Sequence, residues 1–270
     1  IVSTTESGDY PVTSGAHQTT SAGDFDAVVT KLTPTLDNVI WSTYVGGSGG
    51  EAGYSIRVNE TNNTIVVCGG TTSNDIGTTP GVINPTYKGG SSDGFICVLN
   101  DNNGSTNALT YIGTNNYDQT YITEVDNFGN IYVTGQTRGN YPIVNATYSV
   151  PGSAQFIHKL SSDLQNTEYS TLFGDGAKNT IDISITAFLV DDCSNVYVSG
   201  WGGASNNEGS TNNLPITGDA IDGTTDGSDF YFIVLERDAQ SLLYGTYFGG
   251  AGDEHVDGGT SRFDKRGTIY

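Results

Sequence analysis

A hairpin pattern that recurs along the chain constrains the fold more than any other feature. Residues 125–135 read VDNFGNIYVTG, in which a Gly/Asn/Asp turn separates a short apolar run from a β-branched and aromatic run. Runs of this kind on both sides of such a turn predict a β-hairpin. The pattern returns at residues 58–69, at 190–200 and, cut short, at 263–270. We therefore expect a repeat protein.

Two further predicted strands follow the hairpin at nearly constant spacing. One is the run DAVVTKL or its counterparts, which begin at Asp26, Asp93, Ala154 and Asp229, in steps of 67, 61 and 75 residues. The other is the run WSTYVGG or its counterparts, which begin at Trp41, Ala108, Tyr169 and Tyr244 in the same three steps. Because insertions move both landmarks together, the repeat is not chance low complexity.

These landmarks predict an all-β fold, a β-propeller built of four-stranded antiparallel blades with a period of about 66 residues. We expect a single propeller segment over residues 1–270, with a partial blade at 1–46, blades at 53–114, 119–174 and 182–249, and a partial blade at 256–270. An arc of a larger propeller is favoured over a four-bladed ring, in which residues 268–270 would be redundant. The Gly pairs Gly46-Gly47 and Gly249-Gly250 are expected at sharp bends that need positive φ.

Long connections between the second and third strands of each unit are expected on one face, which would be the working surface. Four aromatic residues of these loops could stack on sugar rings: Trp201, Tyr10, Tyr87 and Tyr141. Packing beneath the loops is the alternative interpretation of the same residues.

Composition excludes several classes of protein. The 30 acidic and 10 basic residues give a net charge of −20, which would repel nucleic acid. No apolar run approaches the length of a membrane span. The sequence contains no Met, so we expect a segment of something longer. Its three cysteines fit buried free thiols, with a Cys68–Cys97 disulfide as the alternative.

Acidic loops suggest a calcium site, and no other cofactor is indicated. The densest oxygen clusters are DNNGSTN at 101–107 and the loop that contains Asp222, Asp226 and Asp229, and neither follows a calcium-loop pattern. The hairpin residues Asp126, Asp191 and Asp264 are expected to form Asx turns rather than to bind cations.

The only meeting of carboxylates with a histidine is at Asp253, Glu254, His255 and Asp257. An acid-base pair or a metal site is conceivable there, because His255 and Asp257 would share a strand face. A hydrogen-bonded structural histidine is the alternative. No sialidase box, nucleophile elbow, zinc motif or phosphate loop occurs in the sequence.

The order of these blocks resembles the bacterial seven-bladed β-propeller (SBBP-type) repeat family. Its units read Gly-Asn-x-Tyr-Val-Thr-Gly, Asp-Phe-Pro-x-Thr, Asp-Ala-Phe-Val-x-Lys-Leu and Tyr-Ser-Thr-Tyr-x-Gly-Gly, and the resemblance covers the whole chain. Departures are Ala154 in place of Asp, Gly77 in place of Pro, and Gly174-Asp175 in place of the Gly pair. Residues 244–270 are also similar to blades of large Bacteroidota surface proteins that carry a gliding-motility-type C-terminal domain and use type IX secretion.

That resemblance implies an extracellular or cell-surface module without known catalytic residues. The first hypothesis is a non-catalytic propeller segment, not an enzyme, that acts in adhesion by binding other surface proteins or glycans. The second is a structural subunit that docks with copies of itself into a surface layer or filament. The third is a propeller carbohydrate-active enzyme that uses the acids around His255.

Overall fold

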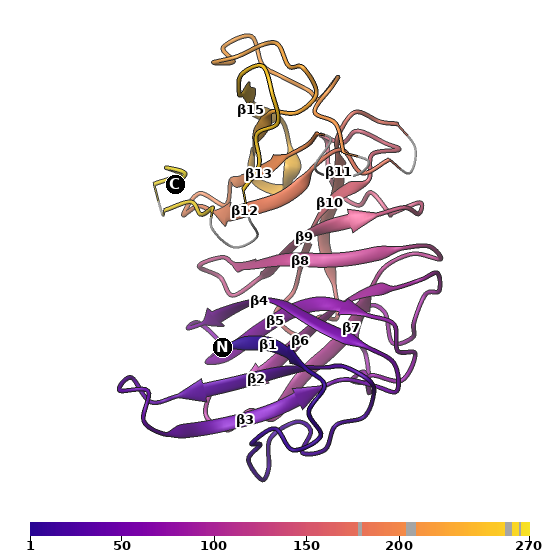
Figure 1. Ribbon diagram of the computed structural model, residues 1–270, viewed down its shortest axis with the longest axis vertical. Helices are drawn as coiled ribbons and strands as arrows, with labels where there is room; N and C mark the ends of the chain where they lie inside the picture. The colour runs from indigo at the N-terminus through magenta and orange to yellow at the C-terminus, as the bar shows by residue number, and fades with distance from the viewer. Residues whose placement is uncertain (178–179, 204–208, 257–260, 265) are drawn as a thin grey trace. The chain divides into compact units, whose positions relative to one another are not determined.

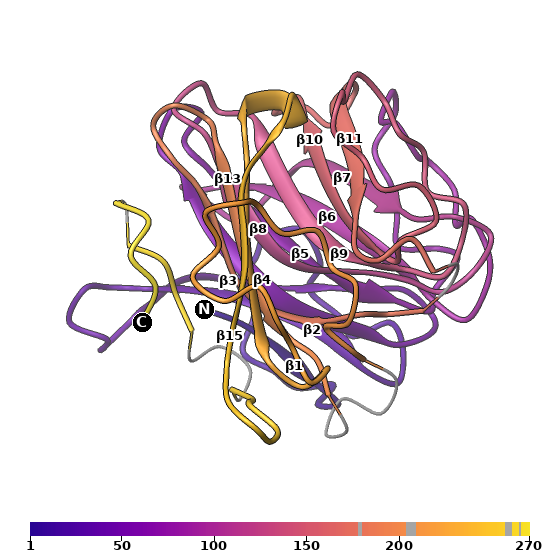
Figure 2. The same ribbon diagram turned by 90° about the horizontal axis from the view of Figure 1, so that it is seen from above.

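The computed structural model describes residues 1–177, 180–203, 209–256, 261–264 and 266–270. Strands joined by loops follow one another from the indigo N-terminus to the yellow C-terminus (Figure 1). A single turn of 3-10 helix, η2 (Arg237–Ala239), precedes the last strand and is visible as a gold coil in Figure 2. Among the described residues, no helix has the length and apolar character needed to cross a membrane. The predicted all-β class is confirmed.

The described strands form four sheets of consecutive strands, the first with three strands and the others with four. Strands of the first, second and fourth sheets pair antiparallel with their neighbours. The first two sheets are β1 (Val2–Thr5), β2 (Asp26–Leu32) and β3 (Val39–Val45), and β4 (Glu51–Asn59), β5 (Thr64–Thr71), β6 (Asp93–Asn100) and β7 (Thr106–Ile112). The last two are β8 (Asp118–Val125), β9 (Ile131–Thr137), β10 (Gln155–Leu160) and β11 (Thr167–Phe173), and β12 (Ser184–Val190), β13 (Val196–Trp201), β14 (Phe230–Leu235) and β15 (Leu242–Phe248).

The chain divides into two compact units. The first unit comprises residues 1–133 and 160–167, and the second comprises residues 134–159 and 168–270. Strands β1 to β8 belong to the first unit, β12 to β15 belong to the second, and β9 to β11 each have residues in both.

The core of the first unit lies between stacked sheets. Alternate residues of β2 and β6 point into it, as the period of two along a strand requires. In this unit β4 lies between β1 and β8 (Figure 1). The buried cluster consists of Ala27, Val29, Trp41, Val45, Ile65, Val67, Ile76, Phe95, Cys97, Leu99, Leu109 and Tyr111.

Each long connection lies along the outermost strand of its sheet. In the first unit, the Thr43 hydroxyl and the Tyr44 N–H both donate to the Gln18 carbonyl oxygen at 3.1 Å. The Thr110 hydroxyl and the Tyr111 N–H donate in the same way to the Asn84 carbonyl oxygen, also at 3.1 Å.

The same arrangement recurs in the second unit. The Thr246 hydroxyl and the Tyr247 N–H donate to the Asp222 carbonyl oxygen at 3.2 and 3.1 Å. The Thr171 hydroxyl donates to the Tyr148 carbonyl oxygen at 2.5 Å. The recurring Thr of the fourth predicted strand thus anchors the long loop, and the loop covers a sheet edge that would otherwise be free for pairing with another chain.

All three cysteines are free thiols. Cys68 on β5 and Cys97 on β6 are buried on adjacent strands, where Cys68 stands opposite Ile96 and Cys97 opposite Val67. The alternative prediction of a disulfide between them is therefore wrong, and the prediction of buried free thiols holds for these two. Cys193, in contrast, is exposed.

Candidate functional site

A pocket of about 310 Å³ opens in the first unit beside the start of β4. Its two exposed rings are Phe25, just before β2, and Tyr54 on β4, each 45% exposed. Gln119 of β8 and Thr72, which follows β5, add polar groups, and Gly50, Ala52 and Gly70 leave the backbone accessible. We call this site the aromatic pocket. Its size lies at the lower end of the range for small-molecule sites, roughly 300 to 1,000 Å³.

Neighbouring side chains hold the pocket residues in place. The Tyr54 ring packs on Tyr121 of β8, with ring centroids 5.3 Å apart, and the Tyr117 and Tyr121 hydroxyls are hydrogen-bonded at 2.8 Å. A Cβ on Gly70 would lie within 2.8 Å of the Gln119 amide nitrogen, so glycine at this position lets that side chain lie across β5. A ring and an amide fixed in this way lose little entropy when a ligand binds.

Behind the pocket wall lies the first of three pairs of acidic side chains, of which two are fully buried, whereas the third contains the half-buried Glu254. In each pair, the aspartate begins one of the recurring runs at residues 26, 93 and 229, and its partner follows the recurring glycine by five positions. Both carboxyl groups surround the bare Cα of that glycine. We call these the acid pairs: Asp26 with Glu51 at Gly46, Asp93 with Asp118 at Gly113, and Asp229 with Glu254 at Gly249.

Asp26 and Glu51 are 0% and 1% exposed. The Glu51 carboxylate accepts from the Gly47 N–H at 2.7 Å and from the Thr71 and Ser73 hydroxyls at 2.6 and 2.5 Å. Asp26 Oδ2 accepts from Ser21 and Ala22 at 2.6 and 3.0 Å. Asp26 Oδ1, in contrast, is buried and receives no hydrogen bond.

Asp93 and Asp118 are both fully buried. Asp93 Oδ2 accepts from the Lys88 N–H at 2.6 Å, and Asp118 Oδ2 accepts from the N–H and the hydroxyl of Thr114 at 2.6 and 2.7 Å. Burial raises the pKa of Asp93 to about 7, and the nearby negative charge of Asp118 adds to the increase.

The corresponding place in the third sheet combines an amide with a carboxylate. Ala154 stands in place of the recurring aspartate, and the next residue, Gln155, opens β10 and surrounds Gly174 together with Asp182. With the amide oriented to satisfy its hydrogen bonds, its nitrogen donates to Asp182 Oδ2 at 2.9 Å and to the Phe173 carbonyl oxygen at 3.1 Å. Its oxygen accepts from the Asp182 N–H at 2.7 Å.

The recurring glycine is required for space at these pairs. None of the four glycines in the pairs Gly46-Gly47 and Gly249-Gly250 has positive φ. The prediction that these glycines are needed for bends with positive φ is therefore wrong. A Cβ on Gly46 would overlap Asp26 Oδ1 and lie 2.7 Å from Glu51 Oε2, and a Cβ on Gly113 would lie 2.5 Å from Asp93 Oδ1. The carboxylates occupy the position that any larger residue would need.

The three aspartates predicted as calcium ligands point to different partners. Asp222 Oδ1 accepts from the N–H and hydroxyl of Thr224, both at 2.9 Å, while Asp226 accepts from the Ser228 and Gly252 N–H groups. Asp229 belongs to an acid pair. Among the described residues, no group of three or more His, Cys, Asp or Glu side chains is arranged to hold a metal ion.

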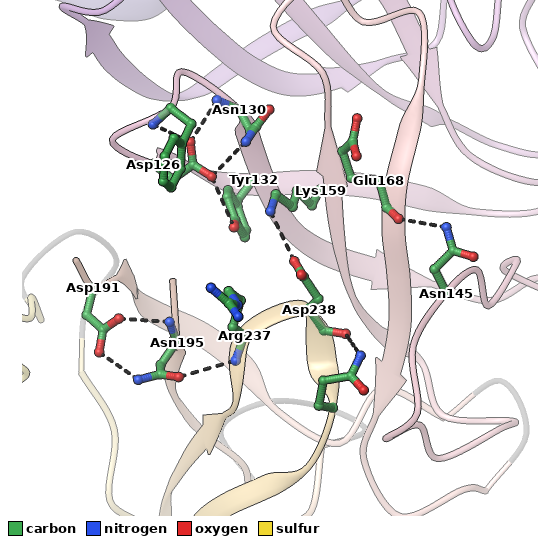
Figure 3. A network of polar contacts seen from close by, with 12 residues as sticks. Asp126, Asn130, Tyr132, Asn145, Lys159, Glu168, Asp191, Asn195, Arg237 and Asp238 are labelled. Carbon is green, nitrogen blue, oxygen red and sulfur yellow. Dashed lines mark hydrogen bonds and ion pairs between the residues drawn. The ribbon is translucent and has the colours of Figure 1, made fainter. Parts of the chain in front are cut away.

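The hairpin aspartates use both carboxylate oxygens in the turn, as Figure 3 shows for Asp126 and Asp191. Asp191 Oδ1 accepts from the Cys193 and Asn195 N–H groups at 2.9 and 2.8 Å, and Oδ2 accepts from the Asn195 amide at 3.0 Å. Asp126 makes the matching bonds to Phe128 and Asn130. The Asx turns predicted at these two hairpins are confirmed.

The aromatic residues predicted for sugar binding lie against other side chains. Tyr141 is 6% exposed, stacks on Phe156 with a centroid separation of 4.2 Å and is hydrogen-bonded through its hydroxyl to His158 Nδ1 at 2.8 Å. The half-buried rings of Tyr10 and Tyr87 pack edge-on against Tyr44 and Tyr111. Trp201 is also half-buried. Their predicted role in sugar binding stays a prediction.

Trp201 lies near His255, with ring centroids 5.8 Å apart. The neighbouring Glu254 carboxylate turns toward Asp229 at Gly249. Asp257, the predicted partner of His255, lies outside the described residues.

Sequence reasoning missed the aromatic pocket and the acid pairs. Phe25 and Tyr54 carry no binding motif in the sequence, so no signal marked them as part of a site. The acid pairs did leave a signal, because an acidic residue follows the recurring glycine by five positions in three of the four repeats: Glu51, Asp118 and Glu254.

No protein-family model matches the chain, and no curated protein matches it either. Among solved structures, the chain is similar to the crystal structure of a protein of unknown function from Bacteroides caccae, with a TM-score of 0.31 and 10% sequence identity. That match covers 88% of this chain and 84% of the other. Any proposal for function therefore depends on the geometry of the site itself.

Proposed function

We propose that the chain is an arc of a β-propeller and a non-catalytic binding module of a secreted or cell-surface protein, which recognises neutral glycans through the aromatic pocket. Support for a propeller comes from consecutive four-stranded sheets and from the same loop anchor at Thr43, Thr110, Thr171 and Thr246. The observation that carries the binding proposal is the pocket itself, because its wall offers exposed rings beside hydrogen-bonding groups.

Aromatic faces beside amide and hydroxyl groups suit a sugar, which has apolar C–H faces and polar edges. In the aromatic pocket, Phe25 and Tyr54 supply the rings, Gln119 supplies the amide, and Thr72 supplies a hydroxyl. None of the described residues that line the pocket is a Lys or Arg, and the whole chain carries a net charge of −20. These features favour neutral sugars over sulfated, phosphorylated or uronic-acid-containing ones.

Binding is a better proposal than hydrolysis for this pocket. A glycosidase needs two carboxyl groups that reach the scissile bond. Glu51 lines the pocket, but it is 1% exposed and accepts three hydrogen bonds, and its neighbour Asp26 is fully buried. Both carboxylates are committed to the protein interior.

The test is binding of neutral oligosaccharides on a glycan array, followed by calorimetric titration of each hit against wild type and two variants, Phe25→Ala and Tyr54→Ala. We expect each truncation to weaken binding by about fivefold or more, because loss of an aromatic anchor at a binding site typically costs more than about 1 kcal/mol. Phe128→Ala is the matched control, since Phe128 is 76% exposed and is not part of the pocket wall.

Equal binding by wild type, Tyr54→Ala and Phe25→Ala would place any glycan elsewhere on the chain. An array without a neutral-sugar hit would refute the proposed ligand class.

Self-assembly is a second candidate, favoured by the inner edge of the first sheet. Among the strands that the structure describes, β1 pairs with β2 alone, whereas its counterpart β5 pairs with strands on both sides. An edge of this kind can accept a strand from another copy. Sedimentation velocity at increasing protein concentration separates the two candidates, because only self-assembly gives species larger than a monomer.

A further inference from the structure

Two buried carboxyl groups meet at Gly113 in the first unit. Asp93 Oδ1 would lie 2.5 Å, and Asp118 Oδ2 3.2 Å, from a Cβ at this position, so the two acids share the space around one bare Cα. Both residues are 0% exposed. Two ionised carboxylates this close in a buried place repel each other strongly, and such pairs commonly keep one proton between them.

The hydrogen bonds around Asp93 leave a place for that proton. Oδ2 already accepts from the Lys88 N–H, but Oδ1 is buried and receives no hydrogen bond. A protonated Oδ1 would become a donor, and the carboxylate that shares the space with it belongs to Asp118. Asp26 Oδ1, beside Glu51, is likewise a buried oxygen that receives no hydrogen bond, which indicates that this geometry belongs to the repeat.

The third sheet contains a natural counterpart of the protonated form. There Ala154 stands in place of the aspartate, and the amide N–H of the next residue, Gln155, donates to Asp182 Oδ2 at 2.9 Å. An amide is a neutral donor at every pH, as a protonated carboxyl group is below its pKa. A site built for a cation gains from negative ligands and would lose charge with this replacement.

We propose that Asp93 holds a proton on Oδ1 in the folded protein near neutral pH and donates it in a hydrogen bond to the Asp118 carboxylate. The raised pKa of Asp93, about 7, agrees with this assignment. Lys88 opposes the increase, and the charge of Asp93 in turn raises the pKa of two nearby phenols, Tyr87 before β6 and Tyr111 on β7.

Proton uptake at this pair makes stability depend on pH. Asp93 in the unfolded chain has the ordinary pKa of about 3.9, so between that value and about 7 the folded state holds a proton that the unfolded state has released. The stabilisation is therefore complete at low pH and is lost as pH rises through about 7. The folding equilibrium constant should fall about tenfold per pH unit in this window for each shared proton.

The test is urea unfolding from pH 4.5 to 8 for wild type, Asp93→Asn and Gln155→Glu. Asp93→Asn replaces the proton by a permanent amide donor, so its folding equilibrium constant relative to wild type should rise about tenfold per pH unit between pH 5 and about 7. Gln155→Glu builds a fourth pair facing Asp182 and should steepen the loss with rising pH. Comparison with wild type at each pH cancels His158 and the other titrating groups.

Asp37→Asn is the matched control, because Asp37 is an exposed carboxylate of the β2–β3 turn whose pKa is lowered by its hydrogen bonds with Thr33 and Thr35. The slope of its unfolding free energy against pH should match that of wild type above pH 5.

If Asp93→Asn also keeps the wild-type slope, both acids are ionised and the inference is overturned. Calcium chloride that stabilises wild type relative to EDTA, but not Asp93→Asn, would also overturn it in favour of a cation site. Should Asp93→Asn fail to fold, the slope of Gln155→Glu still decides, and a slope equal to that of wild type refutes the inference.

Discussion

Replacement of Gly46 by alanine tests the reason for the recurring glycine. Gly46 does not have positive φ, so the backbone itself tolerates alanine at this position. The new Cβ would nevertheless overlap Asp26 Oδ1 and lie 2.7 Å from Glu51 Oε2. One of two buried side chains must therefore leave its hydrogen bonds.

The cost follows from the bonds that would be lost. If Asp26 rotates away, its Oδ2 gives up the Ser21 hydroxyl at 2.6 Å and the Ala22 N–H at 3.0 Å. Each hydrogen bond to a charged group contributes roughly 1.5 to 3 kcal/mol, so Gly46→Ala should lower the free energy of unfolding by about 3 to 6 kcal/mol. Glu51 has three such bonds to lose, which makes its displacement no cheaper.

Urea unfolding monitored by circular dichroism measures this loss. Gly8→Ala is the control in the same unit, because nothing lies within 4 Å of a Cβ there and its φ is not positive. Gly8→Ala should be neutral or stabilise the protein by up to about 1 kcal/mol, through lower entropy of the unfolded chain. A midpoint for Gly46→Ala equal to that of Gly8→Ala would refute the argument that the carboxylates fill this space.

Two further predictions concern buried titratable side chains. Burial raises the pKa of the Cys68 and Cys97 thiols to about 12. The thiol reagent DTNB should therefore label only Cys193 in the native protein, but all three cysteines in denaturant. Rapid labelling of more than one thiol in the native protein would contradict this prediction. Burial also lowers the pKa of His158 to about 3, so the stability that this residue contributes is present above its unfolded pKa of about 6.5 and is lost as pH falls below that value. His158→Gln should remove this loss of stability in acid. An unchanged pH profile in urea unfolding would contradict the assignment.

The strand pattern could be predicted from the sequence because its signals are local. Alternation of side chains and Gly/Asn turns mark each hairpin, and the structure has strands at β4 to β7 in the order that the recurring blocks predict. The turn role of Asp126 and Asp191 was also predictable, since an Asx turn involves only the next few residues.

The sites were not predictable because they join residues far apart in the chain. Phe25 and Tyr54 meet only when two sheets pack, and Asp93 and Asp118 approach each other only around Gly113. A glycine chosen for space has the same sequence signature as one chosen for positive φ, which explains the wrong reason given for Gly46. The aspartates near residue 226 looked dense in sequence, yet their side chains bond to separate loop atoms.

The shared proton at Gly113 is tested most directly by carbon-13 NMR of the side-chain carboxyl groups, titrated across neutral pH in the folded wild-type protein. The account predicts that the Asp93 resonance titrates near pH 7, whereas the exposed Asp37 carboxyl group is already ionised above pH 5. Titration of every aspartate below pH 5 would contradict it.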